Sequence, residues 1–280
     1  MMVDLRPMIA ADVADGMRLK AEAGWNQLEA DWRRFLALEG EGCFVAERHG
    51  RIVGSVTTCQ FGSIGWVAML LVEEAHRGAG IGRGLLIRAL GHLEVRGARS
   101  IRLDATALGR PLYESLGFRV DFRLGRYGGI LDHAGDDEKT CPGRPADLAQ
   151  IAALDRVVTG TDRRALLDRF LRDDPLRSLV AGPVGGPIRG FVLWRRGSSA
   201  DQVGPCIAEP DAGRALLDDL GRRLAGRPVI VDIPTGHDEA VAWAEGHGLR
   251  QNREFWRMTR GEAPVEDLSR LWASSGPEMG

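Results

Sequence analysis

The first half of the chain alternates between helix-like and strand-like hydrophobic spacing. Leucine and alanine recur every three or four positions between residues 83 and 95, which predicts an amphipathic helix. Short apolar runs bounded by glycine or charged residues predict strands. In order, the predicted elements are a strand at 3–6, helices at 11–23 and 27–38, strands at 43–47, 51–59 and 65–72, a helix at 83–95, a strand at 100–105 and a helix at 110–116. Strands that precede and follow helices indicate a mixed α/β fold.

The second half repeats the order of these elements more than it repeats their residues. A hairpin over 179–192 is followed by a strand at 202–208, a helix at 212–224, a strand at 228–233 and a helix at 238–246. The stretch 132–147 is polar and contains both Gly and Pro, which is typical of a linker. We therefore expect a first lobe at 1–132, a second lobe at 145–261 and a tail at 262–280 that holds a short helix around 265–272.

Charge and composition narrow the classes of partner. The 37 Lys and Arg nearly balance the 39 Asp and Glu, and the net charge of −2 gives no basic field for nucleic acid or an anionic membrane. No apolar stretch of about 18 residues and no signal-like N-terminus occurs, so we expect a cytoplasmic protein that does not span a membrane. The four cysteines form no CxxC pair and the histidines no HExxH, so we expect neither a disulfide framework nor a metal site.

The most specific segment is a glycine-rich turn between a predicted strand and a predicted helix. Residues 69–84 read MLLVEEAHRGAGIGRG, and such a turn directs backbone N–H groups of a helix N-terminus toward one anionic guest, a pyrophosphate above all. The segment does not match the dinucleotide fingerprint GxGxxG, whether the pattern starts at Gly78 or at Gly80. A Walker A loop is excluded, because lysine occurs only at Lys20 and Lys139. The pattern that fits is R-x-x-G-x-G, formed by Arg77, Gly80 and Gly82.

This pattern resembles the acetyl-CoA pyrophosphate loop of the GNAT superfamily of N-acetyltransferases. A second motif, Y-x-x-x-G-F from Tyr113 to Phe118, matches the segment that closes the same family's cofactor site. The segments 24–32 and 103–118 also look like a two-lobed subgroup with a degenerate second GNAT lobe. The resemblance implies two GNAT-like lobes, each with a mixed, mostly antiparallel sheet flanked by helices, and acetyl-CoA as the acetyl donor.

The resemblance assigns the cofactor contacts residue by residue. The pantetheine arm is expected along the strand before the loop, with a backbone N–H near Leu71 as oxyanion donor. Thr106 stands where many members have an asparagine that bonds the pantetheine, and a threonine hydroxyl can still donate and accept. The expected cofactor-binding residues are Leu70, Leu71, Val72, Arg77, Gly78, Ala79, Gly80, Ile81, Gly82, Arg83, Thr106 and Tyr113.

Two catalytic roles follow from the chemistry of acetyl transfer to an amine. Tyr113 is the expected general acid, because a phenol with a pKa of about 10 stays protonated at neutral pH and can donate to the leaving thiolate; an aromatic ring that only packs in the helix is the alternative. An ammonium must lose a proton before it attacks, and Glu73, Glu74 and His76 follow the strand beside the expected reaction centre. Of these three we expect Glu73 to be the base; solvated charges at a strand end are the alternative.

Four residues near the start of the second predicted helix are candidates for the acceptor site. Trp25 and Trp32 lie seven positions apart, close to two helical turns, and Asn26 and Asp31 lie between them. Asp31 would attract a cationic amine. Packing of the two tryptophans in the core is the competing interpretation.

The second lobe lacks the cofactor motifs. At the place of the glycine loop it reads VGPCIAEPD, in which Pro205 and Pro210 have no N–H to donate and the carboxylates repel phosphate. Ala244 stands at the place of Tyr113. We therefore expect this lobe to wall the acceptor cleft. The residues that could face the cleft are Asp162, Arg163, Arg164 and Trp256, with surface charge or core packing as the alternative for each.

The expected function is N-acetyl transfer from acetyl-CoA to a primary amine of a small molecule, by direct attack in a ternary complex, in a monomer or homodimer. A protein N-terminus or lysine is the alternative acceptor. A non-catalytic sensor that binds acyl-CoA is the alternative of another class.

Overall fold

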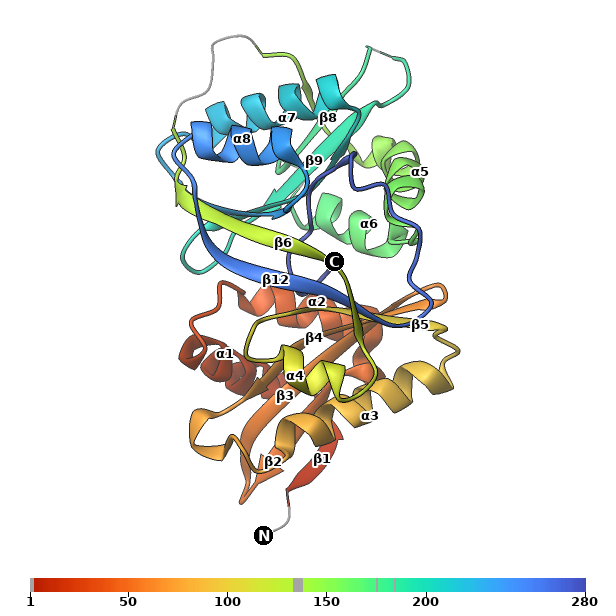
Figure 1. Ribbon diagram of the computed structural model, residues 1–280, viewed down its shortest axis with the longest axis vertical. Coiled ribbons are helices and arrows are strands. Elements are labelled where there is room, and N and C mark those ends of the chain that lie inside the picture. The colour runs from red at the N-terminus through yellow and green to blue at the C-terminus, as the bar shows by residue number, and fades with distance from the viewer. Residues whose placement is uncertain (1–2, 133–137, 175, 184) are drawn as a thin grey trace.

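The computed structural model describes residues 3–132, 138–174, 176–183 and 185–280 and arranges them as two lobes (Figure 1). We keep the names first lobe, second lobe and tail for 1–132, 145–261 and 262–280. The elements up to residue 132 are β1 (Asp4–Pro7), α1 (Val13–Glu22), α2 (Glu29–Glu39), β2 (Phe44–Arg48), β3 (Arg51–Phe61), β4 (Ile64–Val72), α3 (Ile81–Val95), β5 (Ser100–Ala105), α4 (Arg110–Glu114) and β6 (Arg119–Ile130). Those that follow are β7 (Cys141–Pro142), α5 (Leu148–Thr159), α6 (Arg164–Asp173), β8 (Ser178–Ala181), β9 (Gly190–Arg195), β10 (Asp201–Ala208), α7 (Pro210–Arg223), β11 (Pro228–Pro234), α8 (Asp238–Gly246), β12 (Arg250–Gly261) and β13 (Leu271–Ala273).

Helices cover both faces of the sheet in each lobe. The leucine stripe of α3 packs on one face of β2 to β5, and α1 and α2 pack on the other face with Trp32 and Phe35 in the core. In the second lobe α7 and α8 cover one face, and α5 and α6 the other (Figure 1). Neighbouring strands are mostly antiparallel; in the described part of the chain the parallel pairs are β4 with β5 and β10 with β11. The expected mixed α/β architecture is confirmed.

β4 and β5 begin as parallel neighbours and then separate. Their pairing covers only 64–66 against 100–102, although β4 continues to Val72. A bulge in β4 against β3 places the non-glycine residue Met69 at φ +48°. Beyond Trp66, the edge of β4 that faces β5 therefore forms no strand pair with β5. The backbone N–H and C=O groups on this edge can pair with another extended chain.

The two lobes exchange their last long strands. The strand order is β1-β2-β3-β4-β5-β12-β6-β11-β10-β9-β8-β7, so β12 of the second lobe lies between β5 and β6 of the first. β6 in turn pairs with β11 along seven residues. Figure 1 shows β6 and β12 side by side where the lobes meet. Each lobe therefore completes its sheet with a strand from the other.

The tail contains a strand where the sequence predicts a helix. The predicted helix at 265–272 is wrong: β13 pairs with β10 at Cys206 and Ile207, and the N–H of Ser274 donates to the carbonyl of Asp232 on β11. β10 and β11 pair only at 201–203 against 229–231, so they separate as β4 and β5 do. β13 lies between the separated strands. In the second lobe the tail fills the gap that stays open in the first.

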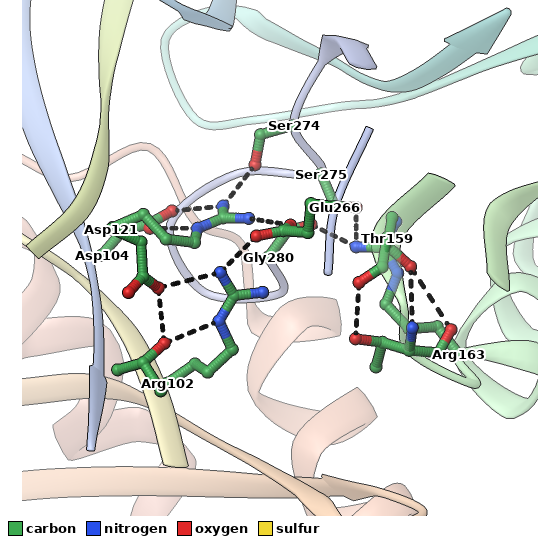
Figure 2. Close-up of polar contacts among 12 residues, drawn as sticks. Arg102, Asp104, Asp121, Thr159, Arg163, Glu266, Ser274, Ser275 and Gly280 are labelled. Atoms are coloured by element: carbon green, nitrogen blue, oxygen red, sulfur yellow. Dashed lines mark hydrogen bonds and ion pairs between the residues drawn. The ribbon is translucent and has the colours of Figure 1, made fainter. Parts of the chain in front are cut away.

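A buried polar cluster fixes the tail to both lobes (Figure 2). Arg257 of β12 binds the Asp104 carboxylate of β5 at 2.7 and 2.9 Å and donates to the Ser274 hydroxyl at 3.0 Å. Arg163 of the second lobe donates to the Ser275 hydroxyl at 2.9 Å. Removing one partner would leave a buried charge without compensation, which makes such a cluster costly to open. Further contacts join Arg102 to Glu266 and Arg163 to the carbonyl of Gly280.

Candidate active site

The glycine loop links β4 to α3 by two left-handed glycines. Gly78 has φ +77°, and Gly80, the N-cap of α3, has φ +81°, conformations that residues with a side chain rarely adopt. The first N–H groups of the 15-residue helix α3 have no acceptor within the helix. Arg77 and Arg83 flank these donors. The loop thus presents the backbone donors and positive charge that a pyrophosphate requires.

A cavity of about 930 Å³ joins this loop to the gap between β4 and β5. Its lining includes both motif segments, α4, the end of α1 and four consecutive residues of β12. Of the predicted cofactor contacts it holds Leu70, Leu71, Val72, Arg77, Gly78, Gly80, Ile81, Gly82, Arg83, Thr106 and Tyr113, whereas Ala79 does not line it. The two motif segments, which are separate in the sequence, therefore share one chamber.

Tyr113 on α4 lines the cavity and packs against Phe118, with ring centroids 6.0 Å apart in an edge-to-face arrangement. Burial raises the pKa of Tyr113 to about 12, so the phenol is protonated throughout the physiological range. Gly109 makes room for its ring, because a Cβ there would lie 3.0 Å from Tyr113 Cε2. The hydroxyl of Thr106 accepts a 3.2 Å bond from the N–H of Gly109 and orders the start of α4.

Glu73 lies outside the cavity lining. Its carboxylate binds Arg18 at 2.6 Å and contacts Arg51, and it lies 2.9 Å from the His76 ring. Burial opposes ionisation, but the nearby guanidinium groups outweigh it and lower the pKa of Glu73. A carboxylate that is held by two arginines and does not line the cavity is a poor proton acceptor for a bound amine, so the geometry does not favour the predicted role of Glu73.

The predicted acceptor residues separate into one that lines the cavity and three that do not. Trp25 lines it. Trp32 is fully buried in the core, as the competing interpretation had it. Asn26 bonds the backbone of Ser199 and Ala200 in the second lobe, and Asp31 caps α2 at the N–H of Leu28 and pairs with Arg34 at 2.8 Å. Asn26 and Asp31 therefore serve structure, because their polar groups already have partners, and Trp32 does so because its ring fills the core.

The second lobe and the tail supply a wall of the cavity. Trp256, which the sequence flagged, lines it together with its neighbours Arg253, Glu254 and Phe255 on β12, and with Pro277 and Glu278 of the tail. Glu278 accepts from Gln27 Nε2 at 3.0 Å and pairs with Arg195. Arg163 is instead buried against Asp155 at 2.6 Å, so it anchors the second lobe. Pro277 and Glu278 belong to no recognisable motif, so their position in the cavity wall is seen only in the structure.

The described part of the second lobe offers no matching site of its own. The N–H of Leu249 donates to the carbonyl of Ala244 just as that of Phe118 donates to Tyr113, so the fully buried Ala244 occupies the place of the tyrosine. β13 occupies the gap between β10 and β11. At these positions the second lobe therefore has neither a counterpart of Tyr113 nor an open strand edge between β10 and β11.

Within the described ranges, no cluster of three or more His, Cys, Asp or Glu has the arrangement of a metal site. None of the helices that the structure describes has the length and apolar character needed to cross a membrane.

Two family models match the chain, and both describe an acetyltransferase (GNAT) domain: one covers residues 39–120 and the other 151–273. Glucosamine 6-phosphate N-acetyltransferase of Trypanosoma brucei brucei is 31% identical over 101 residues, which are 34% of this chain and 68% of that protein. The uncharacterized N-acetyltransferase YitH of Bacillus subtilis (strain 168) is 25% identical over 225 residues, which are 79% of this chain and 78% of that protein.

Solved structures share the whole fold at low sequence identity. A putative acetyltransferase from Pyrococcus horikoshii superposes with a TM-score of 0.85 at 20% identity, covering 99% of this chain and 96% of that one. A tandem GNAT protein from the clavulanic acid biosynthesis pathway superposes with a TM-score of 0.65 at 14% identity, covering 95% and 100%. The chain therefore belongs to the GNAT acetyltransferase family, as a member with two GNAT lobes.

Proposed function

We propose that this chain transfers an acetyl group from acetyl-CoA to a primary amine of a small molecule. The observation that carries the proposal is the single cavity that joins the glycine loop, the open edge of β4 and Tyr113 to a wall built by β12 and the tail. Such a wall restricts the space beside the reaction centre, which suits a small acceptor better than a peptide segment. The names of relatives agree in class, since they are N-acetyltransferases.

The residues present fit acetyl-CoA. The N-terminus of α3 with Arg77 and Arg83 would hold the pyrophosphate, and the free edge of β4 at Leu70 to Val72 would pair with the pantetheine arm. Bound acetyl-CoA would supply the acetyl group as a thioester. The N–H of Leu71 is the proposed oxyanion donor, and Tyr113 the proton donor to the departing thiolate.

Direct transfer is favoured over an acyl-enzyme. No cysteine or serine is present among the described residues that line the cavity. Burial raises the pKa of the thiols of Cys43, Cys59 and Cys206, which keeps them protonated and unreactive. The amine and the acetyl group would therefore have to be held together, and this predicts intersecting rather than parallel initial-rate lines.

The ammonium proton needs an acceptor other than Glu73. Glu22, at the end of α1, lines the cavity; it accepts from the N–H of Glu74, and none of its contacts within the described ranges is an arginine or lysine. We assign the proton to Glu22, directly or through a water molecule.

Release of free thiol from acetyl-CoA, followed against a panel of amines, amino acids and peptides, tests the proposal. Turnover with small amines and not with peptides is the expected result. Turnover confined to peptides would support the alternative acceptor, a protein N-terminus or lysine. Tight binding of acetyl-CoA without turnover on any acceptor would support the sensor.

A further inference from the structure

The acceptor side of the cavity contains a guanidinium without an acidic partner. Four arginines line the cavity, and Arg77 and Arg83 belong to the glycine loop. Arg126 on β6 is neutralised by Asp232, which it binds at 2.7 and 2.8 Å. For Arg253 on β12 no ion pair with an acid is found within the described residues. The guanidinium of Arg253 is thus available to a ligand in the cavity.

Arg253 is an exposed side chain of the cavity lining, and a second guanidinium lies next to it. Arg253 lies opposite Arg126 in the β12–β6 pair, so the two side chains project from the same face of the sheet. Partial burial and the neighbouring Arg126 charge together lower the pKa of Arg253, and the Asp232 carboxylate offsets this only in part. The Asp232 carboxylate is already bound by Arg126, so a bound anion would pair with the exposed guanidinium of Arg253.

The position of Arg253 separates this charge from the glycine loop. Along β12, Arg253 and Phe255 share one face and the alternate residues Glu254 and Trp256 share the other. Trp256 packs with the α3 side of the sheet, where the loop lies, whereas Phe255 contacts the Arg126 guanidinium at 4.9 Å from its ring centre. An anion at Arg253 therefore belongs to the acceptor rather than to the pyrophosphate of the donor.

We propose that Arg253 binds an anionic group of the acceptor, so that the substrate is a primary amine that also carries a carboxylate or a phosphate. This proposal rests on the proposed acetyl transfer. The amine would face the acetyl group near Leu71, while the anion would lie about two residues of strand, roughly 7 Å, beyond Phe255. Charge pairing with Arg253 would also fix the direction in which the amine enters.

Matched pairs of amines test the proposal: amino acids against their amides, and amino sugar phosphates against the unphosphorylated sugars. We expect the wild type to prefer the anionic member of one pair type by about 10- to 100-fold in kcat/KM. The pair type that shows the preference distinguishes carboxylate from phosphate. Arg253→Gln should abolish the preference through KM of the acceptor and leave KM for acetyl-CoA unchanged, and Arg253→Lys should retain part of it.

Arg250→Gln is the matched control, since Arg250 lies on the same strand but outside the cavity lining. Equal use of both members by the wild type, or a preference that survives in Arg253→Gln, would overturn the proposal, as would a rise in KM for acetyl-CoA alone. Calorimetric binding of the same amines to the CoA-loaded protein separates the two hypotheses. Binding that depends on Arg253, without acetyl transfer, would refute the proposed function and support the anion site. Acetyl transfer that is unaffected by Arg253→Gln would support the proposed function and refute the anion site.

Discussion

Tyr113 is the residue on which the proposed chemistry depends most directly. Its phenol lines the cavity and its ring rests on Gly109 and Phe118. Tyr113→Phe removes only the hydroxyl and keeps this packing. We expect kcat to fall by about 100-fold or more, as for the loss of a general acid, while KM for acetyl-CoA changes by less than about 3-fold.

Tyr127→Phe is the control, because Tyr127 lies in the core of the second lobe and is absent from the cavity lining. Steady-state kinetics of both variants decide the point. An unchanged kcat in Tyr113→Phe would remove the phenol from the mechanism.

The raised pKa of Tyr113 leads to a second prediction, which concerns stability at high pH. The unfolded phenol has a pKa of about 10, and burial raises the folded value to about 12, so folding favours the protonated form. Its contribution to stability is complete below pH 10 and is lost as the pH rises toward 12. The chain has two tyrosines, and burial together with the negative charge of Glu245 raises the pKa of Tyr127 as well. Tyrosinate absorbance should therefore rise above pH 10 and follow unfolding measured by circular dichroism; ionisation of Tyr113 in the folded protein at pH 10 or below would contradict this.

Between elements, the tail connects the degenerate lobe to the active cavity. Trp272 of β13 packs against α7 so closely that a Cβ on Gly213 would lie 2.0 Å from its ring. Gly213→Ala should displace β13, lower the free energy of unfolding by about 1–3 kcal/mol and raise KM for the acceptor, because Pro277 and Glu278 follow in the same segment. KM for acetyl-CoA should change little, since the glycine loop is untouched.

The control is a Gly→Ala substitution at a position where the added Cβ contacts no other residue. A Cβ on Gly91 of α3 meets nothing within 4 Å, so Gly91→Ala should stabilise the helix by about 0.5–1 kcal/mol. Chemical denaturation and acceptor kinetics of the two variants provide the comparison. An unaltered acceptor KM in a destabilised Gly213→Ala protein would separate the tail from the acceptor site.

The sequence predicts a structural feature well when the residues that determine the feature are neighbours in the chain. The glycine-rich turn between a strand and a helix, and the helix that carries Tyr113, lie where the sequence predicts them, because turn, cap and ring packing involve residues close in the chain. The nearness of Glu73 to the strand end predicts a base, but its carboxylate pairs with Arg18 and Arg51, which are far away in the sequence, and Glu73 does not line the cavity. The tail could not be read as β13, since a three-residue strand has no period of its own and forms only where β10 and β11 separate.

At the scale of the molecule, the exchange of β6 and β12 makes the lobes interdependent. A chain ending at residue 132 would keep β5 but lose β12, which pairs with β5 over six residues, and would expose that edge to solvent or aggregation. The limits of the two lobes along the sequence, which we propose from the repeat, therefore need not be limits of independent folding.

We predict that fragments 1–132 and 138–280 are insoluble or unfolded when each is expressed alone, and that they purify together as a folded pair when co-expressed. The intact chain should unfold in one transition, because melting either lobe removes a central strand of the other. The co-expressed pair should bind acetyl-CoA, since every residue of the glycine loop and Tyr113 lies in one fragment while β12 supplies the missing wall. Calorimetry of the intact chain and size-exclusion chromatography of the fragments measure this. A fragment 1–132 that folds alone and binds acetyl-CoA would show that the shared strands are dispensable for the cofactor site.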